Sequence, residues 1–176
     1  TFLFTRGAGE WVGEAGCIFN WTASDGKTTV LAVKQTPDYP CLMAWGFEER
    51  GLDRKDSPNV NIETAMGRLQ RLLDGLENTY NWQAPVVQFG NGSDHTHPQP
   101  TLPMLIKEAN KHFEGQIELR HSTFVKFFDE LKEWVSSKQE PLVEHIGELH
   151  QGWDRALLSG VFSARLYLKR MNDHIM

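Results

Sequence analysis

The chain has 176 residues and a formal net charge of −5, and 40% of its residues are hydrophobic and 23% charged. This composition is typical of a globular protein with a core of its own and excludes a disordered chain. The negative charge argues against nucleic acid or an anionic membrane as the partner. No apolar run has the length that is needed to span a bilayer.

The first part of the chain is predicted to be rich in strands. Apolar and β-branched runs predict three strands, over residues 1–5, 17–21 and 28–34. The pair Asp25-Gly26 between the second and third runs is typical of a hairpin turn. Pro37 and Pro40 then predict an irregular connection, because proline fixes its own backbone and lacks an N–H group.

From residue 61 onwards, predicted helices alternate with predicted strands. Apolar residues at helical spacing predict helices over residues 61–78, 101–109 and 122–135, and a last helix from residue 161. Short apolar runs predict strands over residues 86–89, 116–120 and 142–146. This alternation predicts a parallel sheet with right-handed crossovers.

The strongest concentration of polar side chains follows the run at residues 86–89. Gly90 and Gly92 allow a sharp turn and a close approach by another group. A carboxylate and two imidazoles come next: Asp94, His95 and His97. Because ligands of parallel α/β folds bind beyond the carboxyl ends of strands, this position favours a functional site. The alternative is a loop in which Asp94 caps the next helix and both histidines face water.

Other residues permit several interpretations. No glycine-rich phosphate loop and no nucleophile elbow is present. His95 and His97 alternate as metal ligands sometimes do, but a zinc site needs three or four convergent ligands, and we predict none within this chain. Glu148 is a possible acid/base partner for Asp94, although a structural role is the alternative. Arg6 suits the binding of an anion or a sugar hydroxyl, or lies on the surface beside a turn.

The two cysteines, Cys17 and Cys41, match no metal pattern and are interpreted as buried free thiols. Free thiols favour the cytoplasm. Glycosylation sequons begin at Asn20 and Asn91, and we interpret both as chance matches because they lie in or beside predicted strands.

Three sets of segments, taken in order, resemble the α-mannosidases of glycoside hydrolase family 38. The first set is Thr5-Arg6-Gly7, Phe19-Asn20-Trp21 and Ser24-Asp25-Gly26. The second set is Phe89-Gly90-Asn91-Gly92-Ser93-Asp94 and the apolar helix that leads to Ala109-Asn110. The third set is Gly147-Glu148-Leu149, Ser159-Gly160-Val161-Phe162-Ser163-Ala164-Arg165 and Tyr167-Leu168-Lys169-Arg170-Met171-Asn172. Together they span nearly the whole chain.

The resemblance implies an α/β fold. Residues 1–150 would form part of a seven-stranded β/α barrel-like catalytic domain with parallel strands. Residues 151–176 would form a bridge and the first helix toward a following helical domain. The implied activity is hydrolysis of α-mannosidic bonds with retention of configuration, on a mannose-containing oligosaccharide or glycoside. The implied cofactor is a zinc ion that binds the mannose hydroxyls and is also bound by the nucleophilic aspartate.

Individual roles follow by position. Asp94 falls on the proposed acid/base aspartate. Arg6, Tyr39 and His95 fall in or beside substrate-binding positions, although a tyrosine such as Tyr39 also commonly serves only for packing. Leu158 stands where the family has an aromatic residue, so the sequence departs from the family at that subsite.

The zinc-ligand motifs and the nucleophile motif of that family are absent from these 176 residues. The chain also begins on a strand-like run without Met and closes on a helical pattern without a stop signal. We therefore expect a segment of a longer enzyme, inactive by itself, with the zinc ligands outside it. Two alternatives stay open: a non-catalytic carbohydrate-binding or structural α/β domain, and a self-contained hydrolase that uses Asp94 with Glu148. No oligomeric state is predicted.

Overall fold

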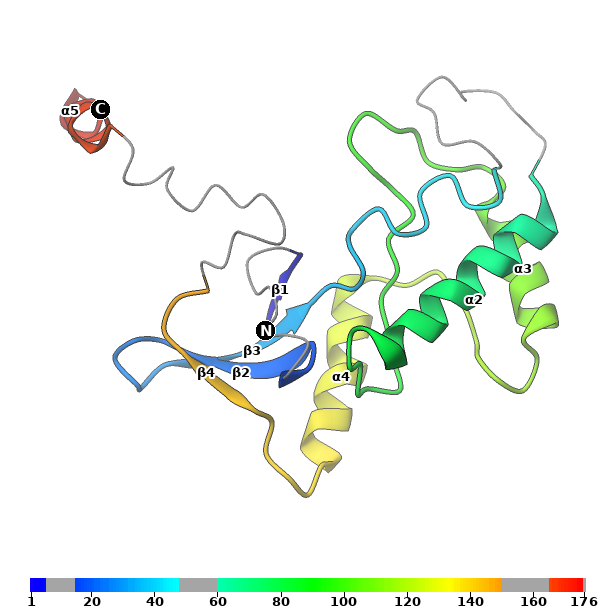
Figure 1. The fold of residues 1–176 in the computed structure, drawn as a ribbon, viewed down its shortest axis with the longest axis horizontal. Coiled ribbons are helices and arrows are strands. Elements are labelled where there is room, and N and C mark those ends of the chain that lie inside the picture. The colour runs from blue at the N-terminus through cyan, green and yellow to red at the C-terminus, as the bar shows by residue number, and fades with distance from the viewer. Residues whose placement is uncertain (6–14, 48–59, 150–164, 176) are drawn as a thin grey trace.

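The structure, a computed structural model, describes residues 1–5, 15–47, 60–149 and 165–175. In these residues four strands form one mixed sheet, which is accompanied by four helices (Figure 1). The strands are β1 (Phe2–Phe4), β2 (Ile18–Thr22), β3 (Thr29–Lys34) and β4 (Glu144–Ile146). The helices are α2 (Ile62–Asn78), α3 (Leu102–His112), α4 (Phe124–Ser137) and α5 (Leu166–Ile175).

The sheet has the order β1-β3-β2-β4 and is not closed into a barrel. β2 and β3 are antiparallel and form the predicted hairpin, in which the carboxylate of Asp25 accepts a hydrogen bond from the Lys27 N–H at 2.9 Å. β1 pairs with β3 in parallel, and β4 pairs with β2 in parallel. The parallel sheet that the alternation from residue 61 onwards predicts is therefore formed only in part: β4 is parallel to its neighbour, whereas the central pair is antiparallel because a hairpin reverses the chain direction.

Residues 86–89 were expected to form a buried parallel strand, and this prediction is wrong. The segment is half-buried and pairs with no strand in the described part of the chain. Its side chains instead bridge two cores: Val86 packs against the sheet and α4, whereas Phe89 packs against α2 and α3. The Val86 carbonyl accepts a hydrogen bond from the Trp82 indole at 3.2 Å. The apolar run is thus half-buried between the two cores without joining the sheet.

The strand expected over residues 116–120 is also absent. A side chain replaces the strand partner there. Asn110 of α3 accepts the Leu119 N–H at 2.6 Å and donates to the Leu119 carbonyl at 2.8 Å. Because both backbone groups of Leu119 are satisfied locally, the segment needs no neighbouring strand. The expected run at residues 142–146 does contain a strand, β4.

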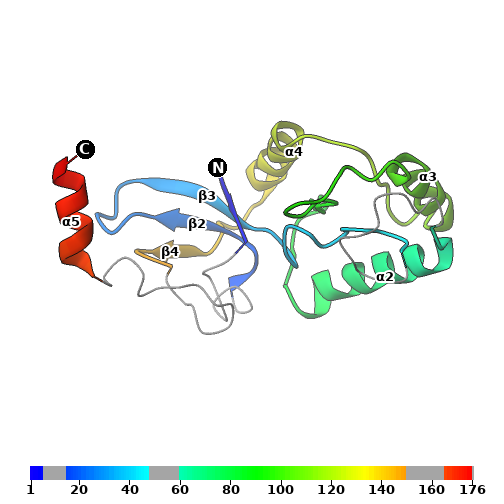
Figure 2. The same cartoon turned by 90° about the horizontal axis from the view of Figure 1, so that it is seen from above.

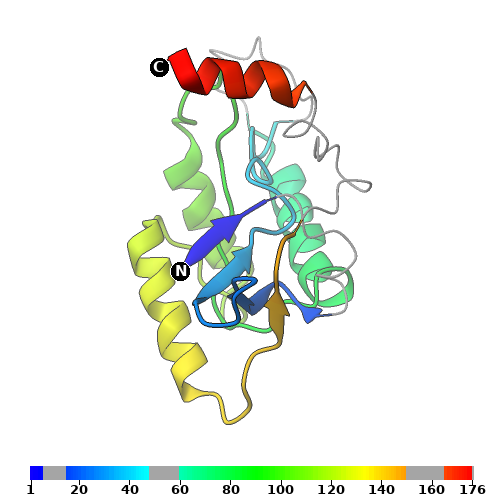
Figure 3. The ribbon, with the colours of Figure 1, turned by 90° about the vertical axis from the view of Figure 1, so that its left-hand side faces the viewer.

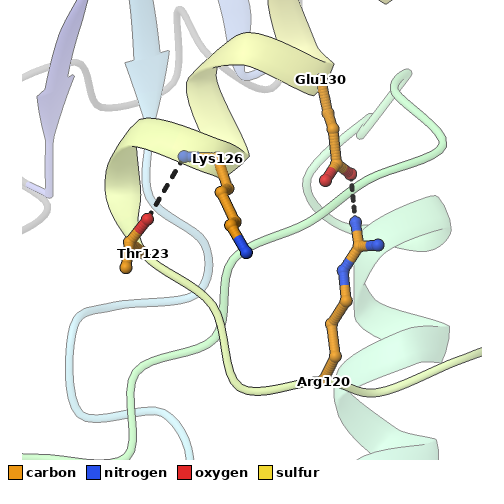
Figure 4. A network of polar contacts seen from close by, with 4 residues as sticks. All are labelled: Arg120, Thr123, Lys126 and Glu130. Carbon is orange, nitrogen blue, oxygen red and sulfur yellow. Dashed lines mark hydrogen bonds and ion pairs between the residues drawn. The ribbon is translucent and has the colours of Figure 1, made fainter.

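The helices follow their sequence signals closely. Asn61 caps α2 by accepting the Thr64 N–H at 2.9 Å, as its position predicts. Pro103 lies in the first turn of α3, where a missing N–H is tolerated. α4 begins one residue after its cap, Thr123, which accepts the Lys126 N–H at 3.3 Å (Figure 4).

An ion pair joins α4 to the connector before it. The Arg120 guanidinium contacts the Glu130 carboxylate, and both side chains are partly exposed (Figure 4). The apolar spacing of residues 122–135 favours an inward position for Phe124, Phe127 and Leu131. Phe127 and Leu131 are buried, but Phe124 is 54% exposed because it lies at the first turn of the helix.

Two larger hydrophobic cores are found in the described residues. They correspond to the sheet with α4 (Figure 3) and to the pair α2 and α3 beside it (Figure 2). In the first, α4 covers one face of the sheet through a cluster of four buried side chains: Ile18, Val33, Phe127 and Leu131. In the second, α2 and α3 pack against residues 41–45, whose Trp45 is fully buried. The indole of Trp45 donates to the Ala65 carbonyl at 2.8 Å. The site described below lies on the second core.

α5 lies apart from both cores (Figure 1), and all of its described residues are exposed. Among the residues that the structure describes, none of the helices combines the length and apolar character that a bilayer span requires.

Candidate functional site

The segment that leads to the site lies against residues 39–42. The Leu42 N–H donates to the Gly90 carbonyl at 2.8 Å, and the side chains of Gln35 and Gln88 are joined by a hydrogen bond of 2.5 Å. At Gly90 a Cβ atom would overlap the carbonyl oxygen of Tyr39. The close approach that the sequence predicts at Gly90 is therefore confirmed, and the approaching group is the Tyr39 backbone.

The loop of residues 91–99 carries the predicted acid/base residue. At its base, the Asn91 amide donates to the Leu42 carbonyl at 2.7 Å and to the Gln99 side-chain oxygen at 3.1 Å. Gln99 in turn bonds both backbone groups of Trp45, accepting its N–H at 3.1 Å and donating to its carbonyl at 2.7 Å. Both ends of the loop are thereby attached to the α2/α3 core.

Asp94 and His95 form the tip of this loop. The Thr96 N–H donates to the Ser93 carbonyl at 3.3 Å, which closes a turn of four residues. His95 has φ of +60°, a left-handed conformation that is uncommon for a residue other than glycine. Such backbone conformations occur at functional sites more often than elsewhere. Both Asp94 and His95 are exposed.

Tyr39 reaches the same region through its backbone. Its carbonyl lies against Gly90, and its N–H donates to the Asp38 carboxylate at 2.8 Å. The structure therefore brings Tyr39 close to the start of the segment that carries Asp94. Arg6, the other predicted substrate-binding residue, lies outside the described residues.

Cys41 and His97 are further ionisable side chains near the loop, and they bear on whether the site could bind a metal ion. Burial raises the pKa of the Cys41 thiol, which points at the Gly90 carbonyl at 3.7 Å and so stays a neutral packing group. His97 is exposed beyond the turn. Within the described ranges, no three histidine, cysteine, aspartate or glutamate side chains converge as a metal site requires. These residues by themselves therefore do not fit a zinc ion.

Glu148, the alternative partner for Asp94, lies beyond β4 at one edge of the sheet and is exposed. Asp94 belongs to the loop before α3, on the other core. The two carboxylates are thus carried by separate parts of the fold, which does not favour their acting as a pair.

Sequence reasoning missed three residues of the site. Asn91 and Gln99 fix the loop, and Arg68 of α2 donates to the carbonyls of Met43 and Cys41, at 2.7 Å each. One signal was present in the sequence: Gln99 lies between two prolines, where regular secondary structure is disfavoured.

Comparison with family models, with curated proteins and with solved structures gives no match.

Proposed function

We propose that this chain supplies the acid/base carboxylate, Asp94, and part of the sugar pocket of a retaining α-mannosidase-like glycosidase. The observation that carries the proposal is the position of Asp94. Its carboxyl is exposed at the tip of a loop whose two ends are hydrogen-bonded to the core. A general acid needs this combination of access to a substrate and a fixed backbone. The family resemblance supplies the substrate class.

The finer architecture belongs to the same proposal. Residues 1–150 would be part of a seven-stranded β/α barrel-like domain, and residues 151–176 would lead into a helical domain. Two features support this arrangement: β1 and β4 are the edge strands of the described sheet, and each is parallel to its neighbour. Parallel edge strands are suited to further strands on either side.

The chemistry proceeds in two steps. Protonated Asp94 donates its proton to the glycosidic oxygen as the bond to the anomeric carbon breaks, and a carboxylate from outside this segment attacks that carbon. Asp94, now ionised, then removes a proton from water, and the water oxygen displaces the carboxylate from the sugar. Retaining sites hold the two carboxyl groups roughly 5 to 5.5 Å apart.

The remaining site residues would bind the sugar. Arg6, Tyr39 and His95 are the proposed contacts to the mannose hydroxyls. Zinc, when bound in the longer enzyme, would hold the mannose hydroxyls, with its ligands outside this segment. The free thiols of Cys17 and Cys41 support a cytoplasmic location.

Replacing Asp94 by Asn in the longer enzyme tests the acid/base role, because Asn keeps the shape and removes the proton. We expect kcat for substrates with poor leaving groups to fall roughly 10² to 10⁴-fold, the usual contribution of general acid catalysis. Substrates with good leaving groups need no proton and should lose much less in the first step. Azide should restore part of the turnover where the second step limits. Asp129→Asn, an exposed carboxylate of α4, is the matched control.

Equal losses for good and poor leaving groups, with no azide rescue, would remove Asp94 from proton transfer. That outcome would favour the second candidate, a non-catalytic carbohydrate-binding domain. The exposure of Asp94 and His95 is the observation in its favour, since an exposed carboxylate can bind sugar hydroxyls without transferring a proton. Mannoside binding measured by calorimetry, without turnover, would identify it.

A further inference from the structure

Two amide side chains close the base of the loop at residues 91–99. Asn91 donates to Gln99 across the loop, and Gln99 bonds both the N–H and the carbonyl of Trp45. The Gln99 amide thereby takes the place of a strand partner for Trp45. The Trp45 side chain is fully buried in the closely packed α2/α3 core. The hydrogen bonds to Trp45 therefore hold the end of the loop at a fixed position relative to this core.

A second set of hydrogen bonds closes the tip of the same loop. The Thr96 hydroxyl donates to the Ser93 carbonyl at 2.7 Å and lies 3.0 Å from the Ser93 N–H, which donates to it. Together with the backbone bond between the same residues, this fixes the two ends of the turn that carries Asp94 and His95. His95, with its left-handed backbone, lies within the turn that these bonds close.

We propose that Gln99, acting through Asn91 and alongside the separate Thr96 closure, is the positioning residue for the Asp94 carboxyl. This inference rests on the proposed function. An aspartate side chain has only two rotatable bonds, so its carboxyl is placed chiefly by its backbone. A misplacement of about 1 Å at a reacting group lowers a rate about 10²-fold. The hydrogen bonds of Gln99 to Trp45 and those between Thr96 and Ser93 both constrain that backbone.

The first test measures the loop itself in the full-length protein. Gln99→Met keeps the volume of the side chain and removes all of its hydrogen bonds. Gln70→Met, on the exposed face of α2, is the matched control. Hydrogen exchange of the Ser93 and Thr96 backbone amides, which are hydrogen-bonded within the turn, should become at least about tenfold faster in Gln99→Met and stay unchanged in Gln70→Met, because the loop then opens without unfolding the core.

The second test measures the consequence for catalysis. In Gln99→Met, kcat for substrates with poor leaving groups should fall about 10²-fold, and the rates for good leaving groups should fall much less. Thr96→Val should act in the same direction, whereas Thr96→Ser keeps the hydroxyl and should restore both the exchange protection and kcat. The Thr96 pair carries the test if Gln99→Met does not fold.

Unchanged exchange in Gln99→Met and in Thr96→Val would overturn the inference, whatever Asp94 does. Faster exchange with a loss confined to KM would overturn it as well, because the loop would then position a binding group. Asp94→Asn distinguishes failure of the proposed function from failure of the positioning role. If Asp94→Asn shows no leaving-group dependence, the proposed function fails. The hydrogen-exchange data still report whether Gln99 fixes the loop.

Discussion

Residue 90 accommodates only glycine, because any Cβ atom there would overlap the Tyr39 carbonyl. The two segments that meet at this point are also joined by the hydrogen bond from the Leu42 N–H to the Gly90 carbonyl. A side chain at this position would therefore separate the loop that carries Asp94 from the segment that carries Tyr39.

Gly90→Ala should destabilise the protein by roughly 1 to 3 kcal/mol, the usual range for overpacking a buried contact. Gly92→Ala is the matched control, since a Cβ at residue 92 meets nothing within 4 Å. Urea denaturation monitored by tryptophan fluorescence measures both variants. Equal stabilities for the two would show that the Tyr39 contact is looser than the structure indicates.

Cys17 is a second residue whose chemistry is set by burial. Burial raises the pKa of its thiol to about 12, against a weaker opposing effect of Lys34. In the unfolded chain the thiol titrates near its ordinary value of 9.0. Between these values the unfolded state has lost the proton and the folded state has kept it, so the free energy of unfolding falls as pH rises.

We expect a slope of up to about 1.4 kcal/mol per pH unit from this group as pH rises above 9.0. Well below pH 9.0 Cys17 should contribute no pH dependence. Cys17→Ala should show a shallower alkaline loss of stability than the unsubstituted protein in urea titrations from pH 8 to 10. Identical slopes would contradict the burial of the thiol. Alkylation by iodoacetamide at pH 8 should likewise require unfolding.

The two glycosylation sequons begin at residues that lie in hydrogen-bonded parts of the structure. The Asn91 side-chain nitrogen donates to Leu42 and Gln99, so glycosylation there would break the base of the loop. Asn20 lies within β2, between β3 and β4. Both positions agree with their interpretation as chance matches.

Among the elements, helices were predicted well because their signals are local. The cap and the apolar spacing of α2 lie within the helix and its first neighbour, and the structure confirms both. The strands predicted at residues 86–89 and 116–120 are absent because a strand forms only where a neighbouring strand supplies backbone hydrogen bonds. At the second of these the partner was the Asn110 side chain.

Thr123→Ala should lower the free energy of unfolding by about 1 kcal/mol, because the first turn of α4 loses the acceptor for the Lys126 N–H (Figure 4). Thr123→Ser keeps the hydroxyl and should lose only a few tenths. Glu130→Gln breaks the neighbouring exposed ion pair with Arg120 and should change stability by less than about 1 kcal/mol. Chemical denaturation of the three variants checks this order, and a larger effect for Glu130→Gln than for Thr123→Ala would contradict it.

At the scale of the whole molecule, the described sheet has open edges at β1 and β4. α5 presents a set of exposed apolar side chains: Leu166, Tyr167, Leu168, Met171 and Ile175. Unpaired edges and apolar surface of this kind promote association between molecules.

The isolated 176-residue chain should therefore fold poorly and lack glycosidase activity, so the denaturation experiments above require the longer enzyme. Dye binding to exposed apolar surface, sedimentation and turnover of an aryl α-mannoside measure these properties. Dialysis followed by metal analysis should find no tightly bound zinc, because the described residues do not bring three ligands together. Robust turnover by this chain alone would refute the proposal that its catalytic partners lie elsewhere. Stoichiometric zinc would instead point to a site built by Asp94, His95 and His97.

The sequence by itself determined the features that depend on near neighbours. These are the α2 cap at Asn61 and the hairpin turn at Asp25-Gly26. Each follows from backbone conformation or from contacts a few residues apart, which the order of residue types encodes directly.

Tertiary structure alone decided the features that depend on distant partners. Gln99 bonds Trp45, 54 positions away, and Asn91 bonds Leu42, 49 positions away. Through these hydrogen bonds, Asn91 and Gln99 of the neighbouring loop satisfy backbone groups within residues 41–45. Hydrophobic periodicity reports that a segment is buried, but the identity of its partner depends on how the whole chain closes on itself.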